Sequence, residues 1–112
     1  MKKLLLLSIS LLTLSFVSNS FAHDLKGAIA SEDRTPKNVV RDIYRNPYET
    51  LDFFGIKQNM TVVELSPGGG WYTEILANYI HYPGTLIAAH FNPDAGGYYK
   101  RGRANFEKKM NS

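Results

Sequence analysis

Hydrophobic positions recur at strand and helix spacings in the second half of the chain. Residues 61–65 (TVVEL) form a compact β-branched run that predicts a strand, and residues 85–91 predict a second one. Between them, apolar residues at positions 72, 75, 76, 79 and 80 follow the spacing of an amphipathic helix. This order of elements predicts one βαβ unit with parallel strands.

Two further helices are predicted before the first strand. Thr35 and Pro36 are a typical helix start, and apolar positions 39, 40, 43 and 44 form a stripe on the helix that follows. Asn46 and Pro47 start the second helix, which ends at Gly55. Residues 23–34 show no periodicity and predict a flexible N-terminal arm, whereas residues 98–112 predict a basic helical segment.

Residues 1–22 have the pattern of a signal peptide. Lys2 and Lys3 precede an apolar run over residues 4–17, and Ser20 and Ala22 are small residues at the positions that a signal peptidase reads. The apolar run is shorter than the roughly 20 residues that span a bilayer. We therefore expect cleavage after Ala22, export to the periplasm and no membrane span in the mature chain. The alternative is an uncleaved N-terminal anchor.

Composition narrows the classes of function. The chain has 112 residues, 13 Lys and Arg, 10 Asp and Glu, and no Cys. Loss of Lys2 and Lys3 with the leader leaves 11 basic residues, so we expect no nucleic-acid partner. Without Cys there is no disulfide, thiolate metal site or Cys nucleophile, and no spacing typical of a metal site or a hydrolase occurs.

The mature chain is short for an α/β domain. A doubly wound domain needs several βαβ units of about 30 residues each, and residues 35–112 supply one. We therefore expect an incomplete α/β domain, the N-terminal part of a larger fold. Its strand edge and apolar surface would be exposed and open to self-association.

Three consecutive glycines, Gly68 to Gly70, lie between the first strand and the helix. Because they have no side chains, a ligand can approach the backbone N–H groups beside the positive end of the helix. Such a loop suits a nucleotide, a phosphate or a carboxylate. It matches neither the phosphate-binding loop GxxxxGK[ST] nor a strict GxGxxG, and a tight connection without a ligand is the alternative.

At this loop the sequence resembles a known family. VVELSPGGG resembles the first motif of class I S-adenosylmethionine-dependent methyltransferases. Residues 41–91, with RNPYETLDFFGIKQNMTVVELSPGGGWYTEILANYI and LIAAHFNPD, are similar to exported predicted methyltransferases, and the basic segment YYKRGRANFEKKM extends the match. The resemblance implies a Rossmann-like methyltransferase fold, of which this chain holds the N-terminal helices and one βαβ unit.

The resemblance also implies a set of cofactor-binding residues. Gly68, Gly69 and Gly70 would line the methionine and ribose part of S-adenosylmethionine, and Glu64 would hold the loop and the amino group of the cofactor. Ser66 stands where the first motif glycine usually falls. The second strand lacks the acid that usually binds the ribose, so Asn92 and Asp94 are the candidates for that contact.

Aromatic and basic side chains near the loop add further candidates. Trp71 is off the apolar stripe and beside the loop, so its ring is a candidate to contact the cofactor. Arg45 is a candidate to close over the cofactor, with an ion pair as the alternative. His90 ends a strand at the edge where open α/β sheets bind ligands.

The sequence therefore predicts an S-adenosylmethionine-dependent methyltransferase-like protein, with an unidentified methyl acceptor and little activity in this chain alone. The alternative is a non-catalytic, truncated periplasmic binding or interaction protein. A folded chain that binds the cofactor favours the first function, and a stable one that does not favours the second.

Overall fold

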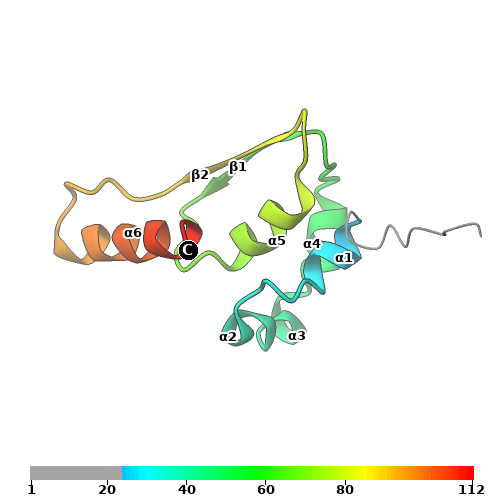
Figure 1. Ribbon diagram of the computed structural model, residues 1–112, viewed down its shortest axis with the longest axis horizontal. Helices are drawn as coiled ribbons and strands as arrows, with labels where there is room; N and C mark the ends of the chain where they lie inside the picture. Colours follow the sequence, from blue (N-terminus) through cyan, green and yellow to red (C-terminus); the bar gives the residue numbers. More distant parts are fainter. Residues whose placement is uncertain (1–23) are drawn as a thin grey trace, which may run out of the picture.

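The computed structural model describes residues 24–112 as six helices and one two-stranded sheet (Figure 1). β1 (Thr61–Leu65) and β2 (Thr85–Ala89) pair in parallel, with Thr61 opposite Thr85 and Leu65 opposite Ala89. The helices are α1 (Leu25–Ile29), α2 (Pro36–Val39), α3 (Asp42–Arg45), α4 (Pro47–Phe53), α5 (Trp71–Tyr79) and α6 (Gly97–Met110). The predicted βαβ unit is confirmed as β1–α5–β2, although β2 ends two residues earlier than expected.

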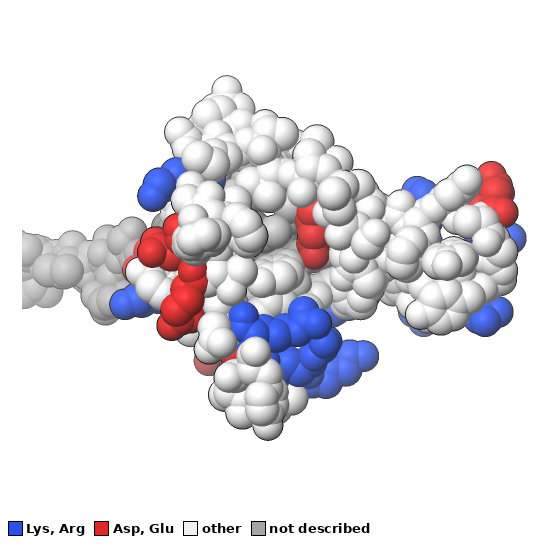
Figure 2. Space-filling model, turned by 180° about the vertical axis from the view of Figure 1, so that it is seen from behind, with Lys and Arg blue, Asp and Glu red and all other residues white. Residues whose placement is uncertain are grey.

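The elements leave a hollow between the sheet and the α2–α3 pair. In Figure 1, α5 lies next to the sheet, and α2 and α3 lie beyond α5. The view from behind in Figure 2 shows the hollow in the middle of the molecule, with Lys and Arg side chains gathered on the α2–α3 side of it. The carboxyl end of β1 and the loop before α5 are therefore next to a basic surface.

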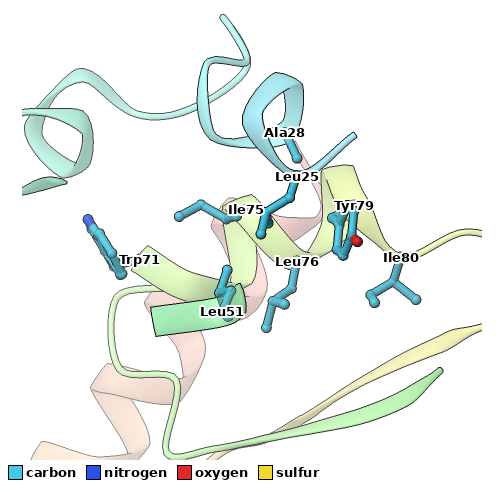
Figure 3. Close-up of a cluster of buried hydrophobic side chains, with 8 residues drawn as sticks. All are labelled: Leu25, Ala28, Leu51, Trp71, Ile75, Leu76, Tyr79 and Ile80. Carbon is cyan, nitrogen blue, oxygen red and sulfur yellow. The ribbon is translucent and has the colours of Figure 1, made fainter. Parts of the chain in front are cut away.

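A core of apolar side chains surrounds α5 (Figure 3). Ile75 is fully buried, and its neighbours come from α1, α4 and α5 itself. The apolar stripe predicted for this helix is confirmed, because its members on α5 are buried or half-buried. The core cluster consists of Leu25, Ala28, Leu51, Trp71, Ile75, Leu76, Tyr79 and Ile80.

The prediction of a flexible arm over residues 23–34 is wrong for its described part. The side chain of Asp24 accepts a hydrogen bond of 2.6 Å from the N–H of Gly27 and caps α1. Leu25 and Ala28 of this helix are buried against the core. Ile29 is partly buried against the same core, so three apolar residues of this five-residue helix face inward, and a helix of little more than one turn is too short for periodicity to detect.

The region after Thr35 also differs from its prediction. It forms two one-turn helices, α2 and α3, rather than one helix, and the expected apolar stripe faces solvent, with Ile43 73% exposed. A buried ion pair explains the inversion: the guanidinium of Arg34 donates to both carboxylate oxygens of Asp42, at 2.6 and 2.9 Å. This pair turns the polar side of the segment toward the core.

α4 is confirmed between Pro47 and Gly55, which has a positive φ of 65°. Leu51 of this helix is buried, whereas Phe53 and Phe54 are exposed. Neither Asn46 nor Thr35 caps a helix with its side chain. The hydroxyl of Thr35 instead donates to Glu74 on α5, so this predicted start residue ties α2 to the central helix.

The sheet is covered on one face only within the described residues. Val62 and Leu86 pack against the core, but Val63, Leu65 and Ile87 on the other face are exposed. Parallel sheets normally carry helices on both faces, so this is an incomplete α/β arrangement, as the sequence predicts. In the same part of the chain, no helix is long and apolar enough to cross a membrane. The predicted signal peptide lies outside the described residues.

Candidate functional site

The loop between β1 and α5 uses left-handed backbone conformations at three positions. The φ angles of Ser66, Gly68 and Gly70 are 54°, 57° and 82°. The N–H of Ser66 donates to the carbonyl of Ala89 at 3.0 Å, which holds the loop at the end of the sheet. Ser66 therefore adopts a conformation that glycine adopts more readily.

The first of two cavities at this loop contains Glu64 and is called the Glu64 cavity here. It has a volume of about 370 Å³, within the range typical of small-molecule sites. Arg41 and Arg45 line it from the α2–α3 side, and Gly68 and Gly69 line it from the loop. A carboxylate and two guanidinium groups thus share one concave surface.

Glu64 is half-buried at the carboxyl end of β1. The hydroxyl of Thr73 on α5 donates to Oε2 of Glu64 at 2.6 Å. Burial raises the pKa of Glu64, and the hydrogen bonds from Thr73 oppose the rise only in part. The carboxylate is therefore held in one orientation, and a positive group that enters the cavity would stabilise its charged form.

Trp71 lines the Glu64 cavity, but most of its surface is in the core. It is 3% exposed, and its Nε1–H donates to the carbonyl of Asn38 at 2.8 Å. The guanidinium of Arg45 lies 4.8 Å from its ring centre, a cation–π contact. The expected role of this ring as a stacking surface for a ligand is therefore not supported, because packing and Arg45 engage it.

The second cavity lies on the other side of the same loop and is called the Arg101 cavity. Its volume is about 570 Å³, and it shares only Gly68 and Gly69 with the Glu64 cavity. The end of β2 and the length of α6 form most of its wall, with Lys37 of α2 at the rim. The two cavities therefore meet at two glycines.

His90 supports the loop from the end of β2. The N–H of Phe91 donates to Nδ1 of His90 at 2.8 Å, so the ring proton is on Nε2. Nε2 lies 3.1 Å from the carbonyl oxygen of Gly68 and donates to it. The sequence places His90 at the ligand edge of the sheet, and in the structure it contacts the predicted loop.

The carboxyl-terminal turns of α6 cover one side of the loop (Figure 1). A Cβ atom on Gly70 would lie 2.7 Å from Cε of Met110 and 3.3 Å from the ring of Phe106. Lys109 donates to the carbonyl of Gly69 at 3.0 Å and forms an ion pair with Glu74. Gly70 lines neither cavity, so its described role is close packing against α6.

Sequence reasoning missed Phe106 and Lys109, because α6 is mostly polar and reads as a solvated basic helix. Phe106 is its only buried residue. The only available signal is the spacing of seven or eight positions between Phe106 and the aromatic pair Tyr98 and Tyr99, which places all three near one helix face.

Asn92 and Asp94 do not join the predicted site. Both are exposed, and the N–H of Asp94 donates to Oδ1 of Asn92 at 2.9 Å, within a turn. Neither lines the Glu64 cavity or the Arg101 cavity. The described residues also hold no group of three or more potential metal ligands. The structure therefore brings Glu64, Gly68, Gly69 and Trp71 together around the Glu64 cavity, and leaves Asn92 and Asp94 apart.

In comparisons with known proteins, the chain matches no family model, no curated protein and no solved structure.

Proposed function

We propose that this chain is the cofactor-binding part of an S-adenosylmethionine-dependent methyltransferase-like protein. The observation that carries the proposal is the Glu64 cavity at the carboxyl end of β1, where a half-buried carboxylate meets a glycine loop and two arginines. The parallel β1–α5–β2 unit supports it, because open α/β sheets bind ligands at this edge.

The charges of the cavity suit the amino-acid end of S-adenosylmethionine. That end carries an ammonium and a carboxylate. Glu64 would accept hydrogen bonds from the ammonium, and Arg41 and Arg45 would donate to the carboxylate. Burial raises the pKa of Glu64, so binding of the ammonium also compensates the cost of its buried charge.

The loop would supply space rather than side-chain contacts. No atom lies within 4 Å of a Cβ placed on Gly68 or Gly69, so a ligand can approach the backbone there. When bound, S-adenosylmethionine supplies a methyl group on a sulfonium. Methyl transfer depends mostly on position, and the residues of this chain would fix one end of the donor.

The fit covers the amino-acid end of the cofactor only. No carboxylate lies at the end of β2 to accept from the ribose hydroxyls, because Asp94 is in a separate exposed turn. We therefore expect binding of the cofactor to be weak in this chain.

Calorimetric titration of the purified protein with S-adenosylmethionine and S-adenosylhomocysteine tests the proposal. Glu64→Gln removes the charge that pairs with the ammonium and keeps an acceptor for Thr73, so we expect affinity to fall about tenfold. Gly69→Val fills the loop where the structure has open space, so affinity should also fall while the fold is kept.

Glu49→Gln and Ala77→Val are the matched controls, because both positions are exposed and line neither cavity. Circular dichroism of each variant reports whether it is folded. A folded wild-type chain that binds neither compound contradicts the proposal, as does equal binding by Glu64→Gln, Gly69→Val and their controls.

A non-catalytic binding protein is the second candidate function. The exposed apolar face of the sheet, with Val63, Leu65 and Ile87, favours it, because contiguous apolar surface marks interaction sites. The same titration separates the two functions: a stable, folded chain without cofactor binding supports the second.

A further inference from the structure

The acidic or basic side chains that line the Arg101 cavity are all basic. Lys37, Arg101 and Lys109 line it, together with the polar side chains of His90 and Asn105, and no carboxylate does. Lys109 is paired with Glu74 and with the carbonyl of Gly69. Within the described residues, Lys37 and Arg101 form no ion pair. Two cations from separate helices are therefore available to a ligand.

Aromatic rings form the apolar part of the same cavity. The ring centres of Phe106 and His90 are 4.9 Å apart, and those of His90 and Phe91 are 4.8 Å apart. The ring centres of Phe91 and Tyr99 are 5.0 Å apart, and those of Tyr99 and Tyr98 are 5.4 Å apart. Phe106, His90, Phe91 and Tyr98 all line the cavity. A planar ring can therefore pack against several aromatic edges and faces at once.

We propose that the Arg101 cavity binds small aromatic anions, in which a planar ring carries a phosphate or a carboxylate. The anionic group would accept from the Arg101 guanidinium and the Lys37 ammonium, since both groups suit oxyanions. The ring would pack among Phe91, Tyr98 and Phe106.

This proposal does not depend on the proposed function, because the two cavities share only the glycines of the loop. Adenine, the aromatic part of S-adenosylmethionine, is uncharged and has no anionic group to pair with Lys37 and Arg101. The cations therefore favour a different ligand from the one proposed for the Glu64 cavity.

Titration of the purified protein with phenyl phosphate, followed by NMR of the backbone amides, tests the proposal. We expect saturable binding that shifts the Gly102 and Asn105 signals and weakens as salt screens the charges. Inorganic phosphate lacks the ring, and benzyl alcohol and adenosine lack the charge, so each should bind at least about tenfold more weakly. Benzoate should bind at the same signals, because it keeps both features.

Arg101→Gln and Lys37→Gln should each weaken phenyl phosphate binding about tenfold. The matched control is Lys100→Gln, which removes the same charge from an exposed position of α6 that lies outside the cavity. Tyr98→Leu removes a ring and should weaken phenyl phosphate more than inorganic phosphate. None of these four variants should change the affinity for S-adenosylmethionine, because that compound is proposed to bind in the Glu64 cavity.

Three outcomes overturn the proposal. The first is no saturable binding of phenyl phosphate by the folded wild-type protein. The second is an equal loss in Lys100→Gln and Arg101→Gln, which would mark a diffuse effect of surface charge. The third is adenosine binding as tightly as phenyl phosphate at the same signals, which would assign the cavity to an uncharged ring.

Discussion

Gly69 and Gly70 are neighbours in the loop and have different physical roles. Gly70 has a φ of 82° and lies under Met110 and Phe106, whereas Gly69 has an ordinary φ and open space around its Cβ position. The sequence does not distinguish the three glycines, because a run of identical residues does not indicate which one is crowded by neighbouring side chains. The backbone conformation and the packing of α6 separate them in the structure.

The first prediction compares Gly70→Ala with Gly69→Ala. In Gly70→Ala the new methyl group collides with α6 and the positive φ is strained, so we expect a loss of about 1–3 kcal/mol in the free energy of unfolding. Gly69→Ala should change it by less than about 0.5 kcal/mol. Urea denaturation followed by circular dichroism measures both. Equal losses would mean that α6 does not pack on Gly70.

The second prediction concerns pH and two glutamates with opposite pKa shifts. Burial raises the pKa of Glu64. Burial also acts to raise the pKa of Glu74, but hydrogen bonds from Lys109 and Thr35 outweigh it and lower that pKa. The charged form of Glu64 therefore costs stability at neutral pH, and this cost disappears as pH falls. The charged form of Glu74 contributes stability, which is lost as pH falls through its lowered pKa.

Thermal unfolding at pH values between about 3 and 7 tests this prediction, since an unperturbed Glu titrates near ~4.3. Glu64→Gln should have a higher Tm than the wild type at pH ~7, with the difference vanishing at the acidic end. Glu74→Gln should have a lower Tm at pH ~7, and that difference should also shrink in acid. A lower Tm for Glu64→Gln at pH ~7 would contradict the assigned sign.

At the scale of elements, the sequence predicts long, regular patterns and misses short ones. The stripe on α5 is confirmed because several residues repeat the same period, and β1 is confirmed because its β-branched residues favour a strand. The stripe over residues 39–44 fails because one buried contact, from Arg34 to Asp42, decides which side of α2–α3 faces inward. Such a contact joins residues eight positions apart and leaves no periodic trace.

In the candidate site, too, the residues of a local sequence pattern are predicted and those brought in by distant contacts are not. Glu64, Gly68 and Gly69 are predicted from a local motif, and they do lie together at the end of β1, whereas Gly70 packs against α6. Asn92 and Asp94 are placed from the position at which a strand should end, but β2 ends at Ala89 and a turn follows. Arg41, which lines the Glu64 cavity, and Lys109 are missed because both come from elements that fold back onto the loop from a distance.

The third prediction concerns the attachment of α6 to the loop. Lys109→Gln removes the ion pair with Glu74 and weakens the contact with the carbonyl of Gly69. The side chain of Glu74 is 7% exposed, so we expect a loss on the order of 1 kcal/mol and faster hydrogen exchange in the last turn of α6. Lys108→Gln, at an exposed neighbouring position, should exchange as the wild type does. Equal exchange in both variants would contradict the attachment.

At the scale of the whole molecule, the parallel sheet has unpaired strand edges and an uncovered apolar face among the described residues. Within residues 24–112, each of its two strands has one unpaired edge, and Leu65 on the open face is 77% exposed. Unpaired edges and uncovered apolar faces favour association. The incomplete α/β arrangement is predicted from the sequence, and so is this exposure, because a single βαβ unit cannot cover both faces of its sheet.

The fourth prediction is that the chain associates with itself through the sheet. Sedimentation velocity at increasing protein concentration should show a growing dimer or larger species. Leu65→Lys should shift this equilibrium toward the monomer by about tenfold, since it places a charge on the apolar face. Val40→Lys makes a similar change on α2–α3, away from the sheet, and should leave association unchanged. A monomer at all concentrations contradicts the prediction.

Trp71 is the only tryptophan in the chain, and its place gives the protein an optical reporter of its own. Its indole belongs to the core, Trp71 also lines the Glu64 cavity, and the guanidinium of Arg45 lies over its ring. Indole emission depends on the polarity of its surroundings. Loss of the core should shift the emission to longer wavelength, and a ligand that displaces Arg45 should change its intensity. One unlabelled fluorescence signal can therefore follow both folding and occupancy of the site.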